Sequence, residues 1–281
     1  MKATDNFTLS NGVTIPCIGF GTWQIESNIA AQCVKTAIET GYRHIDTAAI
    51  YKNEVAVGKG IAESGVARKD LFVTSKVWNS ERGYKKTLAA FNKTLSDLGL
   101  EYLDLYLIHW PATQKRTSEW QKLNSDTWRA FEKLYKDGRI RAIGVSNFLS
   151  HHLTPLIENA QIIPMVNQLE FHPGYMQAEA VETSRKNKML VQAWSPLGTG
   201  KMLDNPTLME IAKKYQKSVA QICIRWCLQN ETLPLPKSTN AGRIKENLNV
   251  FDFEISKADM ETINAMPYFG GSGLHPDEIK F

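Results

Sequence analysis

Short, almost continuously hydrophobic runs alternate with longer amphipathic segments along most of the chain. Such runs are typical of parallel strands that are covered on both faces. The segments between them place apolar residues three or four positions apart, as helices with one buried face do. The predicted strands cover residues 18–20, 44–47, 72–77, 103–109, 142–146, 165–169, 190–194 and 233–236.

About eight strand–helix units in 281 residues predict an α/β fold of the (β/α)8 TIM-barrel type, with a doubly wound sheet as the alternative. Two alternating runs around Asn11-Gly12 predict an N-terminal β-hairpin over residues 7–16, acting as a lid or plug. The glycine-rich segment 266–277 predicts a C-terminal loop over the barrel mouth. No linker or low-complexity run interrupts residues 1–281, which we therefore expect to form a single domain.

Composition and charge narrow the range of partners. The formal net charge is +4, and the lysines and arginines are spread along the chain, so a dedicated nucleic-acid surface is not expected. No apolar run is long enough to span a membrane, and no signal peptide is visible at the N-terminus. We expect a cytoplasmic protein.

The four cysteines do not suggest a disulfide framework. Cys223 and Cys227 lie four apart in an amphipathic helical pattern, where the apolar core is their expected place. Two thiols on one helix face could also bind a metal, but no second ligand pair has matching spacing. We therefore expect no metal site.

In a barrel, function is expected at the C-terminal ends of the strands. Asp46, Lys76 and His109 end three consecutive predicted strands, and Tyr51 follows Asp46 in the next loop, where Asn53 is expected to cap a helix. Taken singly, Lys76 could be a surface residue and His109 a core residue. Their joint placement at one rim predicts a shared site. Further polar residues at the strand ends are Ser146, Asn147, Gln168, Ser195, Lys237 and Ser238.

Motifs along nearly the whole chain resemble those of the aldo-keto reductase family, in particular its microbial branch of 2,5-diketo-D-gluconate and glyoxal reductases. The resemblance implies a TIM barrel that binds NADPH without a Rossmann fold. Neither Gly19-Phe20-Gly21 nor Gly58-Lys59-Gly60 completes the dinucleotide fingerprint, in agreement with this. The matching motifs are Gly19-Phe20-Gly21-Thr22-Trp23, His44-Ile45-Asp46-Thr47-Ala48, Ser75-Lys76-Val77-Trp78, Leu107-Ile108-His109-Trp110-Pro111, Gly144-Val145-Ser146-Asn147, Val166-Asn167-Gln168, Ser195-Pro196-Leu197-Gly198 and Leu235-Pro236-Lys237-Ser238.

The four titratable groups suit the reduction of a carbonyl by hydride transfer, which leaves an oxygen that must receive a proton. A phenol beside an ammonium becomes a better acid, and a carboxylate keeps that ammonium charged. An imidazole can orient the carbonyl by a hydrogen bond. Residue chemistry and family resemblance agree on Tyr51 as general acid, Lys76 as its perturber, Asp46 as the partner of Lys76, and His109 as the orienting group.

The resemblance also implies a cofactor site for NADPH. Trp194 would stack on the nicotinamide, and Ser146, Asn147 and Gln168 would bind its carboxamide. The backbone of Ser195 and Leu197 can offer N–H groups to the pyrophosphate. Two cations near a helix start suit the 2′-phosphate, which favours NADPH over NADH. The residues predicted at the 2′-phosphate are Lys237, Ser238, Thr239, Arg243, Glu246 and Asn247. The predicted cofactor site also includes Gly21, Thr22, Trp23 and Asp46.

Three tryptophans, Trp23, Trp78 and Trp110, follow strand ends and are expected to line the substrate pocket with Tyr51 and His109. An aromatic wall suits small-molecule carbonyl substrates such as aromatic aldehydes, small dicarbonyls, α-keto compounds or keto-sugars. Related microbial reductases often carry an arginine near the start of the C-terminal segment, where this chain has Gly270 and Gly271. The substrate specificity of those relatives, especially for acidic sugars, is therefore not assumed for this chain.

The sequence therefore predicts an NADPH-dependent oxidoreductase that reduces aldehydes and activated ketones, and the resemblance implies a monomer. Two rival classes remain. One is a non-catalytic barrel, of the kind reused as channel subunits and lens proteins. Such a protein would not need the intact tetrad of Asp46, Tyr51, Lys76 and His109. A hydrolase with paired carboxylates would need a second acid at the rim, where only Asp46 is evident.

Overall fold

Eight parallel strands form a barrel in the computed structural model, which describes every residue except 270 and 280. Each strand pairs with its neighbours in chain order from β3 to β10. The barrel closes through backbone hydrogen bonds of 3.0 Å from Gly19 N to Pro234 O and from Gly21 N to Pro236 O. The strands are β3 (Phe20–Gly21), β4 (His44–Asp46), β5 (Phe72–Val77), β6 (Leu103–Ile108), β7 (Ile140–Ser146), β8 (Val166–Glu170), β9 (Leu190–Trp194) and β10 (Leu233–Leu235).

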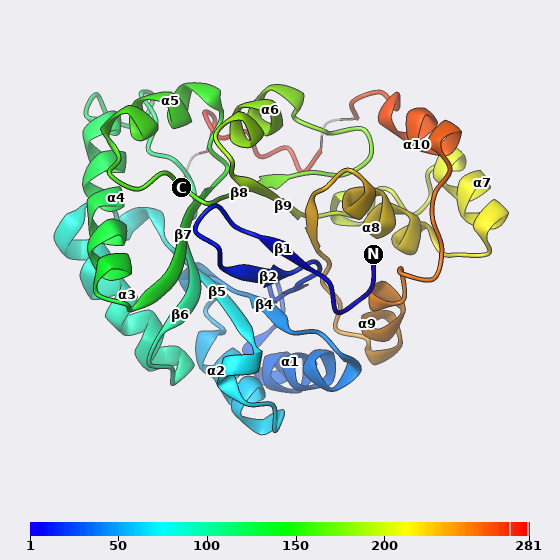
Figure 1. Ribbon diagram of the computed structural model, residues 1–281, viewed down its shortest axis with the longest axis horizontal. Helices are drawn as coiled ribbons and strands as arrows, with labels where there is room; N and C mark the ends of the chain where they lie inside the picture. The colour runs from blue at the N-terminus through cyan, green and yellow to red at the C-terminus, as the bar shows by residue number, and fades with distance from the viewer. Residues whose placement is uncertain (270, 280) are drawn as a thin grey trace.

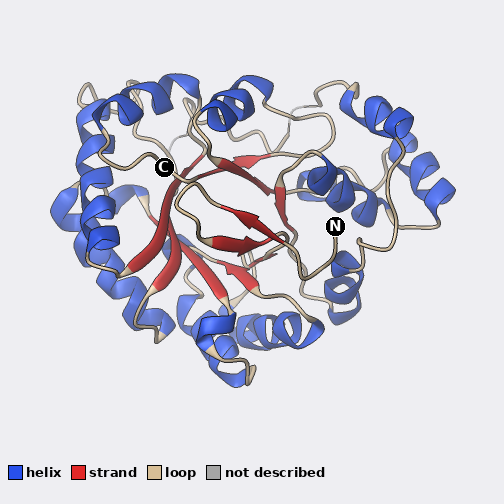
Figure 2. Ribbon diagram, in the orientation of Figure 1, coloured by secondary structure: helices blue, strands red, loops and turns tan. Residues whose placement is uncertain are grey.

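The helices surround the strands on the outside of the barrel (Figures 1 and 2). This confirms the predicted (β/α)8 architecture and excludes the doubly wound sheet. Gly41, Gly99 and Gly138 lie at or just after helix ends, each with a positive φ. The α-helices are α1 (Ser27–Thr40), α2 (Glu54–Glu63), α3 (Tyr84–Leu98), α4 (Trp120–Lys136), α5 (Ser150–Asn159), α6 (Ala178–Lys186), α7 (Pro206–Tyr215), α8 (Val219–Gln229), α9 (Ala241–Leu248) and α10 (Lys257–Asn264).

The predicted hairpin is present as β1 (Asn6–Thr8) and β2 (Thr14–Pro16), and it crosses the centre of the barrel in Figure 1. Asn11, in its turn, donates a hydrogen bond of 2.9 Å to the carbonyl of Arg141, near the start of β7. The hairpin therefore plugs the N-terminal end of the barrel, opposite the end where function is expected, and the alternative of a lid is wrong.

The inside of the barrel becomes polar toward the C-terminal ends of the strands. His44 is fully buried, and its Nε2 lies 3.0 Å from Thr74 Oγ1 on the next strand. Higher in the barrel, Gln168 Nε2 donates to Asp46 Oδ2 and to Gln192 Oε1, both at 2.8 Å. Buried polar side chains of four strands thus form a hydrogen-bonded floor under the barrel mouth.

The C-terminal segment, which follows α10, crosses that mouth. Ser272 donates from its backbone N–H and its hydroxyl to the carboxylate of Glu170, at the end of β8. Further on, Glu278 pairs with Lys115, in the loop between β6 and α4. The described part of this segment therefore lies where the sequence predicts it, and Gly270 falls outside the described residues. No helix among the described residues is long and apolar enough to cross a membrane.

Candidate active site

Asp46, Tyr51 and Lys76 meet at the C-terminal end of the barrel. Lys76, on β5, is fully buried, and its Nζ donates to Asp46 Oδ1 at 2.5 Å and to the carbonyl of Thr47 at 3.0 Å. The same Nζ lies 3.4 Å from the phenol oxygen of Tyr51. The parallel pairing of β4 with β5 brings these strand ends side by side, so the predicted juxtaposition is present.

The charges of these groups are set by burial and by one another. Burial by itself would lower the pKa of Lys76, but Asp46 and Tyr51 raise it above its ordinary value, so the ammonium keeps its charge. Burial also raises the pKa of Tyr51, and Lys76 opposes this shift without cancelling it. The phenol is therefore protonated at neutral pH, with a cation beside it that stabilises the phenolate once the proton has left.

His109 faces the same space from the end of β6. Its ring makes edge contacts with Tyr51 and Trp78, with centroids 5.6 Å and 5.3 Å apart. Burial, and then the charges of Lys76 and Arg82, hold the pKa of His109 well below its ordinary value. The imidazole is thus neutral and can offer a single N–H to an oxygen in the pocket.

Asn53 and Glu54 support the site from behind. Asn53 stands at the N-cap of α2, as predicted, but its side chain makes no capping hydrogen bond to that helix. Its amide instead donates to the carbonyls of Thr22 and Ile25, both at 3.0 Å, which ties the β3 loop to the β4 loop. Glu54 accepts a hydrogen bond of 2.6 Å from Ser75, the neighbour of Lys76 on β5.

The predicted nicotinamide face is assembled around Trp194. Its indole N–H donates to Asn147 Oδ1 at 2.8 Å, which fixes a half-buried ring at the end of β9. The amide of Asn147 donates to His109 O and to Ser146 Oγ, and that hydroxyl donates to Gln168 O. Asn147 adopts a left-handed backbone, with φ of 64°, that turns its side chain back over the strands.

These residues fit a nicotinamide carboxamide in type and placement. Both N–H groups of Asn147 and both of Gln168 are already used within the protein. Their carbonyl oxygens can accept from a ligand amide, whereas a ligand carbonyl would have to replace one of the internal acceptors. Leu197 and Ser195 lie half-buried in the following loop, where Ser195 has a φ of 49°.

The residues predicted to bind the 2′-phosphate lie around the start of α9. Asn240 caps this helix by accepting from Arg243 N at 3.0 Å, and Ser238 Oγ accepts from Asn240 N at 3.1 Å. The side chains of Lys237, Thr239 and Arg243 are exposed there, so two cations and a helix N-terminus face solvent together. Such an arrangement suits a phosphate. Later in this helix, Glu246 is half-buried and Asn247 is buried.

Next to this group, Gly21 is buried against the backbone of β10, and a Cβ there would lie 3.2 Å from Leu235 O and 3.8 Å from Lys237 Cβ. Thr22 is tied to Asp46 O by its hydroxyl at 3.0 Å. Trp23, which follows, has 39% of its surface exposed and stands at the edge of the site.

The aromatic wall has a member that the sequence did not predict. The ring of Phe281 stacks on Trp78, with centroids 5.3 Å apart, and meets Trp110 edge-on at 5.7 Å. Trp110 also contacts Trp194. No motif marks Phe281, because only the course of the C-terminal segment brings it back over β5 and β6.

Comparison with known proteins places this arrangement in a family. The aldo/keto reductase family profile matches residues 17–267. The chain belongs to this family. It is 54% identical over 278 residues to the glyoxal reductase of Bacillus subtilis (strain 168), covering 99% of this chain and 98% of that protein.

Solved structures of aldo-keto reductases agree. One, from a Medee basin deep-sea metagenome library, superposes with a TM-score of 0.93 at 42% identity and covers 99% of this chain and 100% of the other. The Bombyx mori aldo-keto reductase, solved in complex with NADP, gives a TM-score of 0.85 at 37% identity over 94% and 92% of the two chains. As a member of the aldo/keto reductase family, the protein is an oxidoreductase that reduces carbonyl groups.

Three further sets of side chains lie beneath or away from the predicted site residues. Gln192 supports Gln168 from a fully buried position, and its Nε2 has no partner in the described part of the chain. Cys223 and Cys227 are buried in the core, as expected, and burial raises the pKa of both thiols. His151, His152 and Asp277 converge at a separate place, described below.

Proposed function

We propose that this protein is an NADPH-dependent reductase of aldehydes and activated ketones, in which Tyr51 donates the proton. The observation that carries the proposal is the position of one buried ammonium, Lys76, between the carboxylate of Asp46 and the phenol of Tyr51. This pairing holds a charge where a phenolate would form and leaves the phenol protonated until then.

The residues divide the work of reduction among them. When bound, the reduced nicotinamide supplies a hydride to the carbonyl carbon. Tyr51 gives its proton to the carbonyl oxygen, the C=O double bond becomes a C–O single bond, and the phenolate is stabilised by Lys76. Neutral His109 orients the carbonyl by a hydrogen bond. Solvent then returns a proton to Tyr51, so that the site is restored.

NADPH is favoured as the cofactor for two reasons. Lys237 and Arg243 are exposed at the start of α9, where a terminal phosphate would meet two cations. In addition, the Bombyx mori relative was solved with NADP. Trp194, held by Asn147, supplies a flat face for the nicotinamide.

Aromatic aldehydes and small dicarbonyls are the substrate classes that the pocket favours. Trp78, Trp110 and Phe281 form a mostly apolar wall beside His109. The relative named glyoxal reductase supports the dicarbonyl class.

The test is consumption of NADPH with an aromatic aldehyde, methylglyoxal, an α-keto ester and a keto-sugar acid, for the wild type and for Tyr51→Phe. We expect turnover that falls about a thousandfold in the variant, within the range for loss of a general acid. The dissociation constant for NADPH, measured by quenching of tryptophan fluorescence, should be nearly unchanged. Full turnover in the variant would refute the role of Tyr51. Absence of turnover in the wild type, despite NADPH binding, would favour the non-catalytic barrel.

A further inference from the structure

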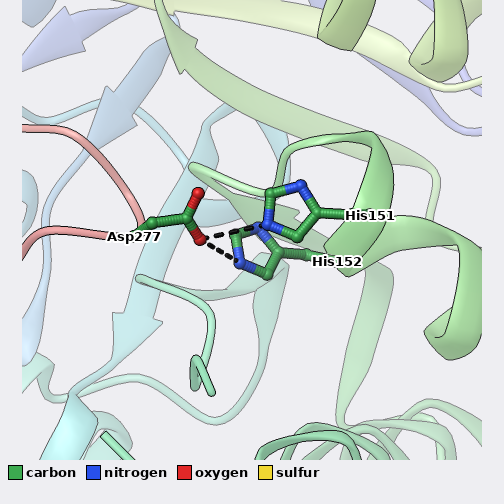
Figure 3. A group of neighbouring side chains, drawn as sticks. All are labelled: His151, His152 and Asp277. Atoms are coloured by element: carbon green, nitrogen blue, oxygen red, sulfur yellow. Dashed lines mark hydrogen bonds and ion pairs between the residues drawn. The ribbon is translucent and has the colours of Figure 1, made fainter. Parts of the chain in front are cut away.

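Three metal-ligating side chains from two distant segments converge outside the tetrad. His151 and His152 lie in the first turn of α5, and Asp277 lies in the C-terminal segment (Figure 3). The Nε2 atoms of both imidazoles lie 3.0 Å from the same oxygen, Asp277 Oδ1. Figure 3 shows both rings turned toward that carboxylate.

The cluster is held in place by its surroundings. His152 is almost completely buried, and its ring is packed edge-on against Trp120 and Phe148, with centroids 5.8 Å and 6.0 Å away. The rings of His151 and His152 lie 4.0 Å apart. His152 is therefore fixed before any ligand arrives, whereas His151 and Asp277 remain reachable from solvent.

We propose that His151, His152 and Asp277 bind one divalent cation of the zinc class. Two imidazole nitrogens and one carboxylate oxygen are a donor set that Zn²⁺ and its d-block neighbours accept. In a tetrahedral Zn²⁺ site with bonds of about 2.0–2.1 Å, neighbouring ligand atoms lie about 3.3 Å apart. The present separations of 3.0 Å between each Nε2 and Oδ1 need to open by only a few tenths of an ångström.

The protonation state of the cluster also suits a metal, at one cost. The ring of His152 is neutral, because its Nδ1 acts as a hydrogen-bond acceptor. Its Nδ1 accepts the N–H of Leu149 at 3.2 Å, which leaves the proton on Nε2. Ligation moves this proton to Nδ1 and gives up the Leu149 bond. The site should therefore be weaker than a closed four-ligand zinc site.

A fourth protein ligand is within reach. His275 is about half exposed, and its Nδ1 lies 3.9 Å from Asp277 Oδ2. Its Nδ1 accepts the N–H of Asp277 at 3.3 Å, so the side chain would have to give up that bond and turn to reach a metal held by the other three residues. Water can take the same position, so His275 should strengthen the site without being essential to it.

Metal binding would cross-link the C-terminal segment to α5. Four residues after Asp277, the chain reaches Phe281, which lies on Trp78 and Trp110. A ligand that binds only when the C-terminal segment lies against α5 stabilises that arrangement by mass action. The cation would thus hold the described end of the segment over the barrel mouth.

The experiment is a titration of the untagged, full-length protein with Co²⁺, followed by its visible absorption, and then by displacement with Zn²⁺ in a calorimeter. We expect one Co²⁺ per chain, with the strong absorption of a site of low coordination number. His151→Ala and Asp277→Asn should each weaken binding by at least about tenfold. Glu278→Gln is the matched control, because this carboxylate pairs with Lys115 and should not affect binding. His275→Ala should cause a smaller loss.

A second readout needs no metal spectrum. Limited proteolysis, followed by intact mass, should show that Zn²⁺ slows cleavage within residues 271–279 in the wild type and not in Asp277→Asn. Co²⁺ binding that is substoichiometric, or that His151→Ala and Asp277→Asn leave unchanged, would overturn the proposal. Neither of these variants removes a buried ring, so a loss of metal binding would not be explained by a failure to fold. Both readouts are independent of substrate, and failure here leaves the proposed reductase activity standing.

Discussion

A single lysine organises the polar end of the barrel at the scale of residues. Lys76 has no exposed surface, yet it carries a charge, because its Nζ contacts the carboxylate of Asp46, the carbonyl of Thr47 and the phenol of Tyr51. An unpaired ammonium in such a place would lose its proton. The contacts that make the charge tolerable also direct it at Tyr51, so the structural and the proposed chemical roles of Lys76 are inseparable.

Arg243 gives a test of cofactor preference at the same scale. Arg243→Ala removes an exposed guanidinium from the start of α9. We expect the KM for NADPH to rise about tenfold or more, the usual effect of losing one hydrogen bond to a charged group. The KM for NADH, which lacks the 2′-phosphate, should barely change. Lys245→Ala, an exposed cation on the same helix, serves as the control. Equal effects on both cofactors would remove the phosphate role of Arg243.

The sequence predicted the members of the tetrad but not the groups that hold them. Strand ends are visible as the limits of hydrophobic runs, so Asp46, Lys76 and His109 could be placed on one rim. The bonds of Gln168 to Asp46 and Gln192 depend on which side chains of three strands face inward at the same level, and therefore on register. A sequence pattern read one strand at a time does not give that register.

At the scale of elements, most predicted strands agree with the structure to within about two residues. The runs 72–77 and 190–194 coincide with β5 and β9. The first strand is shifted, because residues 18 and 19 lie just ahead of β3, which covers Phe20–Gly21 and closes the barrel against β10. Asn53 occupies the predicted N-cap position, but its Oδ1 accepts from Thr47 Oγ1 and its amide donates to carbonyls of the neighbouring loop, so the side chain does not cap α2.

Two glycines explain the close packing of α2, and Gly58 provides a test. A Cβ on Gly58 would lie 2.1 Å from Leu98 O, at the end of α3, and one on Gly60 would lie 2.5 Å from Ala31 O in α1. Helix propensity alone would make Gly58→Ala stabilising by about 1 kcal/mol. We expect instead a loss of about 2–3 kcal/mol in the free energy of unfolding, because backbone atoms must move apart. Urea denaturation measures the sign directly, and a gain in stability would contradict the packing argument.

The C-terminal segment supplies a second test at this scale, through Phe281. Phe281→Ala removes a ring that contacts Trp78 and Trp110. We expect kcat/KM for an aromatic aldehyde to fall by about three- to tenfold, the usual worth of an aromatic contact, and that for methylglyoxal to change little. Tyr268→Ala is the control, because this exposed ring of the same segment contacts Tyr175 instead. An equal loss of kcat/KM with both substrates would contradict this prediction. It would show that Phe281 supports the catalytic residues instead of contacting the ring of the substrate.

At the scale of the whole molecule, the barrel buries several ionisable groups, and stability must therefore depend on pH. Glu54 is the clearest case, because it is almost completely buried and, within the described part of the chain, its carboxyl group hydrogen-bonds only to the hydroxyls of Ser75 and Thr94. Burial raises the pKa of Glu54 from 4.5 to about 7. The folded protein therefore holds a proton that the unfolded chain releases at lower pH.

Glu54→Gln should remove this pH dependence. Because the folded pKa lies above the unfolded value, the stabilising proton is fully present below pH 4.5 and is lost as the pH rises through about 7. The variant should therefore gain stability relative to the wild type from acid toward pH 8, by about 3 kcal/mol in the free energy of unfolding. Urea denaturation across this range measures the difference, with Glu63→Gln, an exposed acid at the end of α2, as the control. A difference that stays constant with pH would mean that the pKa of Glu54 is the same in the folded and unfolded states, and that the hydroxyls of Ser75 and Thr94 suffice to hold a buried carboxylate.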